Sequence, residues 1–247
     1  MSKSLAQKNA LVTGASRGIG AAIAKRLAAD GANVTLTYVG SQAAAAAVVD
    51  EIRSAGGAAQ AVHADALEPG ASLAAVETVV SDQGSIDILI SNAGVNISKP
   101  LDDIQASDYD TVFGVNVRAN LELIKAASTH MEAGGRVILI TATIANSFFA
   151  PGLGLYGASK AAANAFVQGW ARDLGPKGIT INAVVPGPID TDMNPADTDL
   201  ADHLRSMVPL GRYGTPEEVA SLTAFLAGPE AAFITGARMI IDGGMNV

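Results

Sequence analysis

The chain has 247 residues, of which 49% are hydrophobic and 16% charged, and its formal net charge is −8 at pH 7. This composition is typical of a folded protein with a large core, and the acidic balance argues against a nucleic-acid-binding protein, which needs a basic face. The sequence contains no cysteine, which excludes disulfide bonds, zinc–thiolate sites and cysteine nucleophiles.

Short runs of apolar, often β-branched residues alternate with longer alanine-rich segments of helical period. We expect strands at 9–13, 33–37, 58–64, 86–94, 135–143, 178–187 and 236–244. We expect helices at 19–31, 43–57, 71–84 and about 109–131, and a further helix that carries Tyr156 and Lys160. Nearly continuous apolar strands indicate a parallel sheet with helices on both faces. The pattern predicts one domain over 1–247, an α/β Rossmann-type fold with a doubly wound sheet of about seven strands.

The turn after the first expected strand reads TGASRGIG, residues 13–20. Gly14, Gly18 and Gly20 would let the backbone turn tightly and approach a phosphate, whose negative charge the N-terminus of the following helix favours. The spacing is G-x-x-x-G-x-G rather than G-x-G-x-x-G, so a tight turn without a ligand is the alternative interpretation.

Five motifs occur in a fixed order: TGASRGIG at 13–20, NAG at 92–94, GVNVRAN with Asn116, YGASK at 156–160 and VVPGPIDT at 184–191. Through these motifs the chain resembles the short-chain dehydrogenase/reductase family over essentially its whole length. The resemblance implies an enzyme that moves a hydride between a nicotinamide and a carbonyl carbon. It also implies a homotetramer, for which the small residues around Lys160 would permit close helix packing between subunits.

Tyr156 and Lys160 lie one helical turn apart, on the same face of the expected helix. A tyrosine hydroxyl can give the carbonyl oxygen its proton if its pKa falls from about 10 to about 7, and the charge of Lys160 would supply part of that shift. The resemblance implies that Lys160 also holds the nicotinamide ribose, and that Asn116 supports a water that relays protons. A solvated surface pair is the alternative.

The family usually has a serine thirteen residues before the tyrosine, and its hydroxyl orients the substrate carbonyl. Thr143 stands at this position, so the chain departs from the common pattern. Threonine keeps the hydroxyl but adds a methyl group and stiffens the first side-chain torsion. We therefore predict that Thr143 is the third catalytic residue, and that Ser147, nine residues before Tyr156, does not fill this role.

The resemblance extends to the cofactor contacts. It places Asp65 near the adenine, where a solvated loop aspartate is the alternative, and Thr191 near the nicotinamide carboxamide. The glycine of NAG at 92–94 would allow the backbone to pack closely against the cofactor, and the alternative interpretation of this motif is an ordinary turn after a strand. The expected cofactor-binding residues are Gly14, Ser16, Arg17, Gly18, Ile19, Gly20, Tyr38, Ser41, Asp65, Asn92, Ala93, Gly94, Tyr156, Lys160, Pro186, Gly187, Ile189 and Thr191.

The second expected strand ends at Tyr38, where NAD-binding sites of this type usually have an acid that holds the ribose 2′-hydroxyl. A 2′-phosphate instead needs hydrogen-bond donors, and Arg17 and Ser41 are placed to provide them. We therefore predict NADP(H) rather than NAD(H) as the cofactor.

The substrate pocket is expected between Thr143 and Tyr156 and in the loop after Pro186. Its apolar residues predict a ketone or aldehyde flanked by hydrophobic groups; they are Phe148, Phe149, Leu153, Leu155 and Met193. A 3-oxoacyl-acyl-carrier-protein reductase is the alternative enzyme, and it ranks below a general carbonyl reductase or alcohol dehydrogenase. Its acidic carrier protein would need basic residues beside the substrate cleft, and Arg172 is the one residue that could serve.

A binding protein is the second class of hypothesis. Residues 186–196 also resemble a branch of the family that includes a cyclic-dinucleotide-binding regulator, but no basic cluster accompanies them. The isolated histidines His63, His130 and His203 lack ligand spacing, so no metal site is expected. Asp190 and Asp192 look like solvated acids or caps, and Phe166 and Trp170 like core or subunit-contact residues.

No apolar run resembling a signal peptide precedes the first expected strand, and no charge-free apolar stretch is long enough to cross a bilayer. We therefore expect a soluble, cytoplasmic enzyme with a small carbonyl substrate and without a membrane or nucleic-acid partner.

Overall fold

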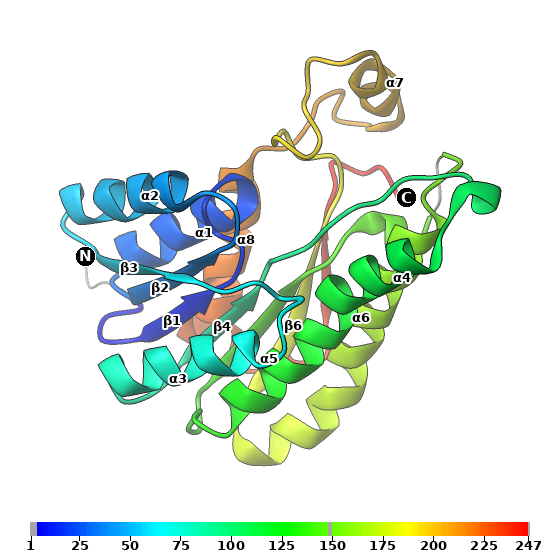
Figure 1. Ribbon diagram of the computed structural model, residues 1–247. Helices are drawn as coiled ribbons and strands as arrows, with labels where there is room; N and C mark the ends of the chain where they lie inside the picture. Colours follow the sequence, from blue (N-terminus) through cyan, green and yellow to red (C-terminus); the bar gives the residue numbers. More distant parts are fainter. Residues whose placement is uncertain (1–3, 148–149, 247) are drawn as a thin grey trace.

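The computed structural model describes residues 4–147 and 150–246. Seven strands form one parallel sheet in the order β3-β2-β1-β4-β5-β6-β7 (Figure 1). This confirms the predicted doubly wound α/β fold. The strands are β1 (Asn9–Val12), β2 (Asn33–Tyr38), β3 (Ala58–His63), β4 (Ile88–Ser91), β5 (Arg136–Ile140), β6 (Thr180–Pro186) and β7 (Arg238–Ile241).

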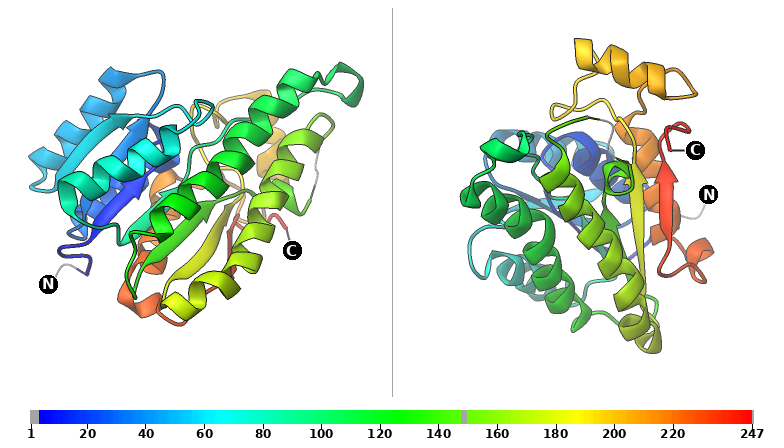
Figure 2. Two further views of the ribbon diagram at one scale, coloured as in Figure 1. Left: turned by 60° about the horizontal axis from the view of Figure 1, so that its bottom comes forward. Right: turned by 90° about the vertical axis from the view of Figure 1, so that its right-hand side faces the viewer.

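Helices cover both faces of the sheet (Figures 1 and 2). Side chains of β4 alternate between the two faces: Ile88 and Ile90 pack with helices α1, α2 and α8, and Leu89 packs with α3, α5 and α6. The helices are α1 (Gly18–Ala29), α2 (Gln42–Ser54), α3 (Ala71–Gln83), α4 (Ala106–Phe113), α5 (Ala119–Ser128), α6 (Gly154–Leu174), α7 (Asp199–Met207) and α8 (Pro216–Ala227). Burial on both faces explains the continuous apolar strands.

The helix expected at about 109–131 is interrupted. It begins earlier, as α4, passes through a π-helical segment, η2 (Gly114–Arg118), and continues as α5. A π-helical turn adds a residue to the turn and is often found at functional sites. Here it contains Asn116, and it therefore changes the direction in which that side chain points relative to a regular helix.

Two helices, α7 and α8, were not among the expected elements. Residues 187–198 connect β6 to α7, so most of the segment expected to be irregular lies outside helices and strands. Helix α7 stands apart from the two helical layers, beyond one end of the sheet (Figures 1 and 2). Among the described residues, no helix is both long and apolar enough to cross a bilayer.

Candidate active site

The carboxyl ends of parallel strands meet at one edge of the sheet, where doubly wound folds bind ligands. The glycine turn follows β1 at this edge. Gly14 has a φ of 61°, and a Cβ there would lie 2.9 Å from the Cα atom of Ala93; a Cβ at Gly20 would lie 2.5 Å from Nδ2 of Asn92. Asn92 donates hydrogen bonds from Nδ2 to the carbonyls of Thr13 (2.9 Å) and Gly14 (3.0 Å). The structure thus brings together the glycine turn and the NAG motif, and glycine is required at both turn positions.

This turn has the form of a phosphate cradle. Helix α1 begins at Gly18, and Arg17 at its N-cap makes no side-chain cap, so the first-turn amides of the helix have no side-chain acceptor from the cap residue. Ser16 and Ile19 flank the turn and are half-buried. Amides at a helix N-terminus and a glycine backbone without room for side chains fit the pyrophosphate of a dinucleotide.

A small cavity of about 30 Å³ opens beside the turn, between the ends of β1, β2 and β4. Its walls are short side chains: Thr13, Thr37, Ala64, Ala66, Ser72, Ala75, Ser91, Ala93, Val115, Ala119 and Leu123. Asp65 lies between two of these residues and accepts a hydrogen bond from the amide of Leu67 (2.9 Å). Asp65 therefore stabilises a local turn, and the expected contact with an adenine stays a prediction.

Tyr156 and Lys160 lie on helix α6, with the Nζ atom of Lys160 5.7 Å from the centre of the Tyr156 ring. Lys160 is buried and donates a hydrogen bond to the carbonyl of Ile140, at the end of β5 (3.1 Å). Burial raises the pKa of Tyr156 to about 12 and lowers the pKa of Lys160 to about 8. In the chain without a cofactor, desolvation of the phenolate thus moves the pKa of Tyr156 away from the expected value of about 7. The expected fall, which Lys160 was to supply only in part, stays a prediction.

Asn116 joins the segment after β4 to helix α6. Its Oδ1 accepts a hydrogen bond from the Val95 amide (2.9 Å), and its Nδ2 donates to the Val95 carbonyl and to Oγ of Ser159 (both 2.9 Å). Ser159 in turn donates to the carbonyl of Tyr156 (2.7 Å). Asn116 thus positions the part of α6 that carries Tyr156, and its support of a relay water stays a prediction.

Two of these contact residues, Val95 and Ser159, were missed in the sequence. Ser159 lies within the YGASK motif, but nothing in the motif distinguishes a hydrogen-bonding serine from a packed one. Gly94 lies between Lys160 and Asn116, because a Cβ added to it would be 3.3 Å from Nζ of Lys160 and 3.4 Å from Oδ1 of Asn116. The NAG motif therefore lies against Lys160 as well as against the glycine turn.

Thr143 follows β5 and begins a short 3₁₀ turn, η3 (Thr143–Ala145), which packs against α6. It is 5% exposed, and its hydroxyl has no hydrogen-bond partner among the described residues. Ser147 is exposed, and its amide donates to the carbonyl of Thr143. Thr143 rather than Ser147 thus has the buried and available hydroxyl that a carbonyl-orienting residue needs.

The end of β2 carries Tyr38, whose ring meets the ring of His63 edge-on, 5.6 Å between centroids. Ser41 caps helix α2, and its Oγ accepts a hydrogen bond from the amide of Ala44 (3.3 Å). The hydroxyl hydrogen of Ser41 is still available to a phosphate.

The segment after β6 lies over the glycine turn. A Cβ at Gly18 would lie 3.4 Å from Cγ2 of Thr191. Ile189 is buried, and a Cβ at Gly187 would lie 2.6 Å from Cβ of Asp242, so the backbone after Pro186 is held against the segment following β7. Thr191 therefore lies near the glycine turn, and Pro186, Gly187 and Ile189 precede it on the same segment.

The residues expected to line a substrate pocket are only partly described. Phe148 and Phe149 lie outside the described residues. Leu153 and Leu155 are half-buried at the start of α6, and Met193 is 59% exposed. In the described ranges, no group of three or more histidine, aspartate or glutamate side chains is arranged to hold a metal ion.

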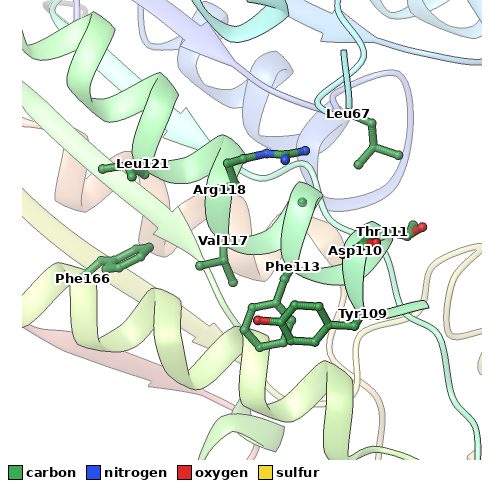
Figure 3. A pocket seen from close by; sticks show the side chains of 10 residues that line it. Leu67, Tyr109, Asp110, Thr111, Phe113, Val117, Arg118, Leu121 and Phe166 are labelled. Carbon is green, nitrogen blue, oxygen red and sulfur yellow. The ribbon is translucent and has the colours of Figure 1, made fainter. Parts of the chain in front are cut away.

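A cavity of about 780 Å³ has neither Tyr156 nor Lys160 in its lining. It is formed along α4, η2 and α5, with Phe166 of α6 and Leu67 at its sides (Figure 3). Most of its lining is apolar, and the rings of Tyr109 and Phe113 stack at its edge with 4.3 Å between centroids.

Comparison with known proteins agrees with this geometry. A family model described as enoyl-(acyl carrier protein) reductase matches residues 14–246. A dehydrogenase/reductase from Sinorhizobium meliloti 1021 is similar in structure, with a TM-score of 0.98, 51% identity and coverage of 100% of this chain and 98% of that one. A short chain dehydrogenase from Burkholderia cenocepacia J2315 in complex with NADP has a TM-score of 0.97 and 49% identity, with coverage of 99% and 100%.

One relative differs in its described role. The cyclic-di-GMP-binding biofilm dispersal mediator protein of Escherichia coli (strain K12) is 44% identical over 236 residues, which are 96% of this chain and 96% of that protein.

Proposed function

The chain belongs to the short-chain dehydrogenase/reductase family of oxidoreductases, and we propose that it is an NADPH-dependent reductase that converts a ketone or aldehyde to an alcohol. The observation that carries the proposal is that Lys160 lies beside the Tyr156 ring on α6, while Gly94 of the NAG motif, which contacts the glycine turn through Asn92 and Ala93, lies against Lys160. The 3₁₀ turn that Thr143 begins packs against the same helix.

NADP(H) is the proposed cofactor. A structural relative with 49% identity binds NADP, and β2 of this chain ends in Tyr38 rather than in an acid. Gly14, Gly18 and Gly20 with the first turn of α1 would hold the pyrophosphate. Arg17 and Ser41 would hold the 2′-phosphate. When bound, NADPH supplies the hydride.

The chain's own residues manage the proton and the charge. With a pKa of about 12, Tyr156 keeps its proton at neutral pH and donates it to the carbonyl oxygen. Lys160, with a pKa of about 8, is mostly charged at neutral pH, and it stabilises the phenolate that this donation leaves. Thr143 donates a hydrogen bond to the same oxygen and orients the carbonyl.

The substrate is proposed to be a carbonyl compound with hydrophobic neighbours, because Leu153, Leu155 and Met193 lie at the proposed pocket. A 3-oxoacyl-acyl-carrier-protein reductase remains the alternative enzyme. Arg172 is exposed and is the single basic residue proposed for the docking of an acidic carrier. A rate with an acyl-carrier-protein substrate far above the rates with small ketones would reverse this order.

A panel of ketones and aldehydes with NADPH or NADH tests the proposal. We expect turnover with NADPH, a clear preference over NADH, and an alcohol of one handedness from each prochiral ketone. A clear catalytic preference for NADH would refute the cofactor assignment.

A cyclic-dinucleotide-binding regulator is the second candidate, because the relative from Escherichia coli with 44% identity carries that description. A bis-phosphate ligand needs free cations. Near the segment after β6, however, Arg205 pairs with Asp202, Arg212 pairs with Glu218 (2.6 Å) and Arg17 faces Asp192 (3.6 Å), so each of these cations already has a carboxylate beside it. Isothermal titration with cyclic di-GMP, alongside the reductase assay, separates the two candidates.

A homotetramer is proposed from the resemblance, and the face around the cavity along α4, η2 and α5 is the proposed subunit contact (Figure 3). This face is mostly apolar, and it also carries Asp110 and Arg118. In a two-fold dimer contact, Asp110 of one subunit would face Arg118 of the other, and the reverse pair would form as well. Light scattering should give the mass of four chains for the wild type, and Phe166→Asp should lower that mass.

The cytoplasmic location expected from the sequence also remains a prediction.

A further inference from the structure

We propose that Asp192 is a specificity-determining residue that competes with the 2′-phosphate of the cofactor for the side chain of Arg17. The inference rests on the proposed function, because it takes Arg17 as the ligand of that phosphate. Asp192 would thereby weaken the binding of NADPH and of NADP⁺, while leaving the binding of NADH unchanged.

The two side chains approach each other across the glycine turn. Nε of Arg17 lies 3.6 Å from Oδ2 of Asp192. The backbone segments next to them are also close, since a Cβ added at Gly18 would lie 3.4 Å from Cγ2 of Thr191. Arg17 and Asp192 therefore face each other because two backbone segments meet, and not through an isolated side-chain encounter.

The backbone fixes the position of Asp192. Thr191 and Asn194 form a tight turn, in which the amide of Asn194 donates to the carbonyl of Thr191 (2.9 Å). The side chain of Asp190 accepts a hydrogen bond from the amide of Ala196 (3.0 Å), which holds the base of the same loop. Asp192 lies within this turn and is thus presented towards Arg17.

The contact is weak enough for a phosphate to displace it. The side chains of Arg17 and Asp192 are 72% and 71% exposed, and exposed ion pairs contribute little to stability. A 2′-phosphate carries nearly two negative charges and three acceptor oxygens, so it pairs more strongly with a guanidinium than one carboxylate does. The phosphate wins the competition, but with less affinity than if Asp192 were absent.

A non-specific charge effect would act differently. Asp197 lies in the same segment and carries the same charge, and it forms no ion pair with another described residue. If Asp192 acted only by adding negative charge near the cofactor, then Asp197→Asn would have a similar effect. Asp197→Asn is therefore the matched control for Asp192→Asn.

The test is the dissociation constants of NADPH and NADH, measured by titration calorimetry on the full-length wild type, Asp192→Asn, Asp197→Asn, Arg17→Gln and the Arg17→Gln/Asp192→Asn double variant. We expect Asp192→Asn to tighten NADPH binding about two- to five-fold, the range of an exposed ion pair, and to leave NADH unchanged. Asp197→Asn should resemble the wild type. In the Arg17→Gln background, Asp192→Asn should have no effect.

Salt gives an independent readout, because the advantage of Asp192→Asn over the wild type should largely disappear at about 1 M salt, where the Debye length is about 3 Å. Equal changes for NADPH and NADH, an equal effect of Asp197→Asn, or an undiminished effect without Arg17 would each overturn the inference. If the wild type binds NADPH and reduces ketones but Asp192→Asn changes nothing, only this inference fails. If the wild type binds no NADPH, both it and the proposed function fail.

Discussion

The Nζ atom of Lys160 lies 5.7 Å from the centre of the Tyr156 ring, and burial shifts the pKa values of the two side chains in opposite directions. The pKa of Tyr156 rises to about 12 and that of Lys160 falls to about 8. Near neutral pH the tyrosine keeps its proton and the lysine is mostly charged. These are the two protonation states that a proton donor beside a stabilising cation requires.

The rate of carbonyl reduction should fall at alkaline pH because Lys160 loses its charge there. We expect kcat/KM with NADPH to decrease above about pH 8, and to fall about ten-fold per pH unit at pH values well above the pKa of Lys160, because the charged fraction of the lysine falls at that rate. A pH profile of the wild type checks this. A rate that stays constant to about pH 10 would show that the charge of Lys160 is not needed.

Stability should also depend on pH through Lys160. Its pKa falls from 10.5 to about 8 on folding, so between these values the unfolded chain binds the proton that the folded chain has lost. The contribution of Lys160 to the free energy of unfolding therefore rises with pH in this window. Relative to Lys160→Met, the wild type should gain about 2 kcal/mol between about pH 8 and about pH 10.

Urea denaturation of both proteins measures this gain, and the range ends at about pH 10 to avoid the titration of Tyr156. Because Lys160→Met has no group that titrates at this position, it removes the effect of all other groups from the comparison. A stability difference that stays constant or changes in the opposite sense would contradict the assigned burial of the charge.

Thr143 should act as the hydrogen-bond donor to the substrate. Thr143→Ala should lower kcat/KM by about 10²-fold or more, which corresponds to about 3 kcal/mol and to the loss of one oxyanion donor. Thr143→Ser should stay active and accept bulkier ketones, and Ser147→Ala should have little effect. The assignment is wrong if Ser147→Ala abolishes turnover and Thr143→Ala does not.

Gly94 should be required for activity because it lies against two site residues. A Cβ at Gly94 would be 3.3 Å from Nζ of Lys160 and 3.4 Å from Oδ1 of Asn116, so Gly94→Ala should shift the Lys160 ammonium by a few tenths of an ångström. We expect a loss of kcat/KM of about ten-fold, about 1.4 kcal/mol. A Cβ at Gly169, on α6, would meet nothing within 4 Å, so Gly169→Ala is the control and should leave activity unchanged. Equal activities of the two variants would contradict this reading.

The fold could be predicted from the sequence because its signals are local. The central strands β4 (ILIS) and β5 (RVILI) are mostly apolar, and a glycine turn follows the first strand. The missed helix α7 has only nine residues and buries only Ala201 and Leu204. Its apolar residues Leu200, Leu204 and Met207 do recur at helical spacing, but they directly follow a polar segment rich in proline and aspartate that was expected to be irregular. The π-helical segment around Asn116 was also missed, because an added residue in a helical turn leaves no pattern that a periodicity of 3.6 residues can reveal.

The site could be predicted less completely. The spacing of Tyr156 and Lys160 indicated that they share a helix face, but their pKa values depend on burial, which elements distant in the sequence create. The contact of Arg17 with Asp192 depends on the path of the segment after β6. In the sequence, Asp192 therefore looked like any solvated acid.

The central claim is that Tyr156 completes the transfer of a hydride from NADPH to a carbonyl carbon. It is tested most directly with NADPH deuterated at the transferring position, a panel of ketones, and mass spectrometry of the alcohols formed by the wild type and Tyr156→Phe. The account predicts deuterium on the carbinol carbon with the wild type, and no alcohol from Tyr156→Phe although it still binds NADPH. A wild type that binds NADPH but forms no deuterated alcohol, or a Tyr156→Phe variant as fast as the wild type, would contradict it.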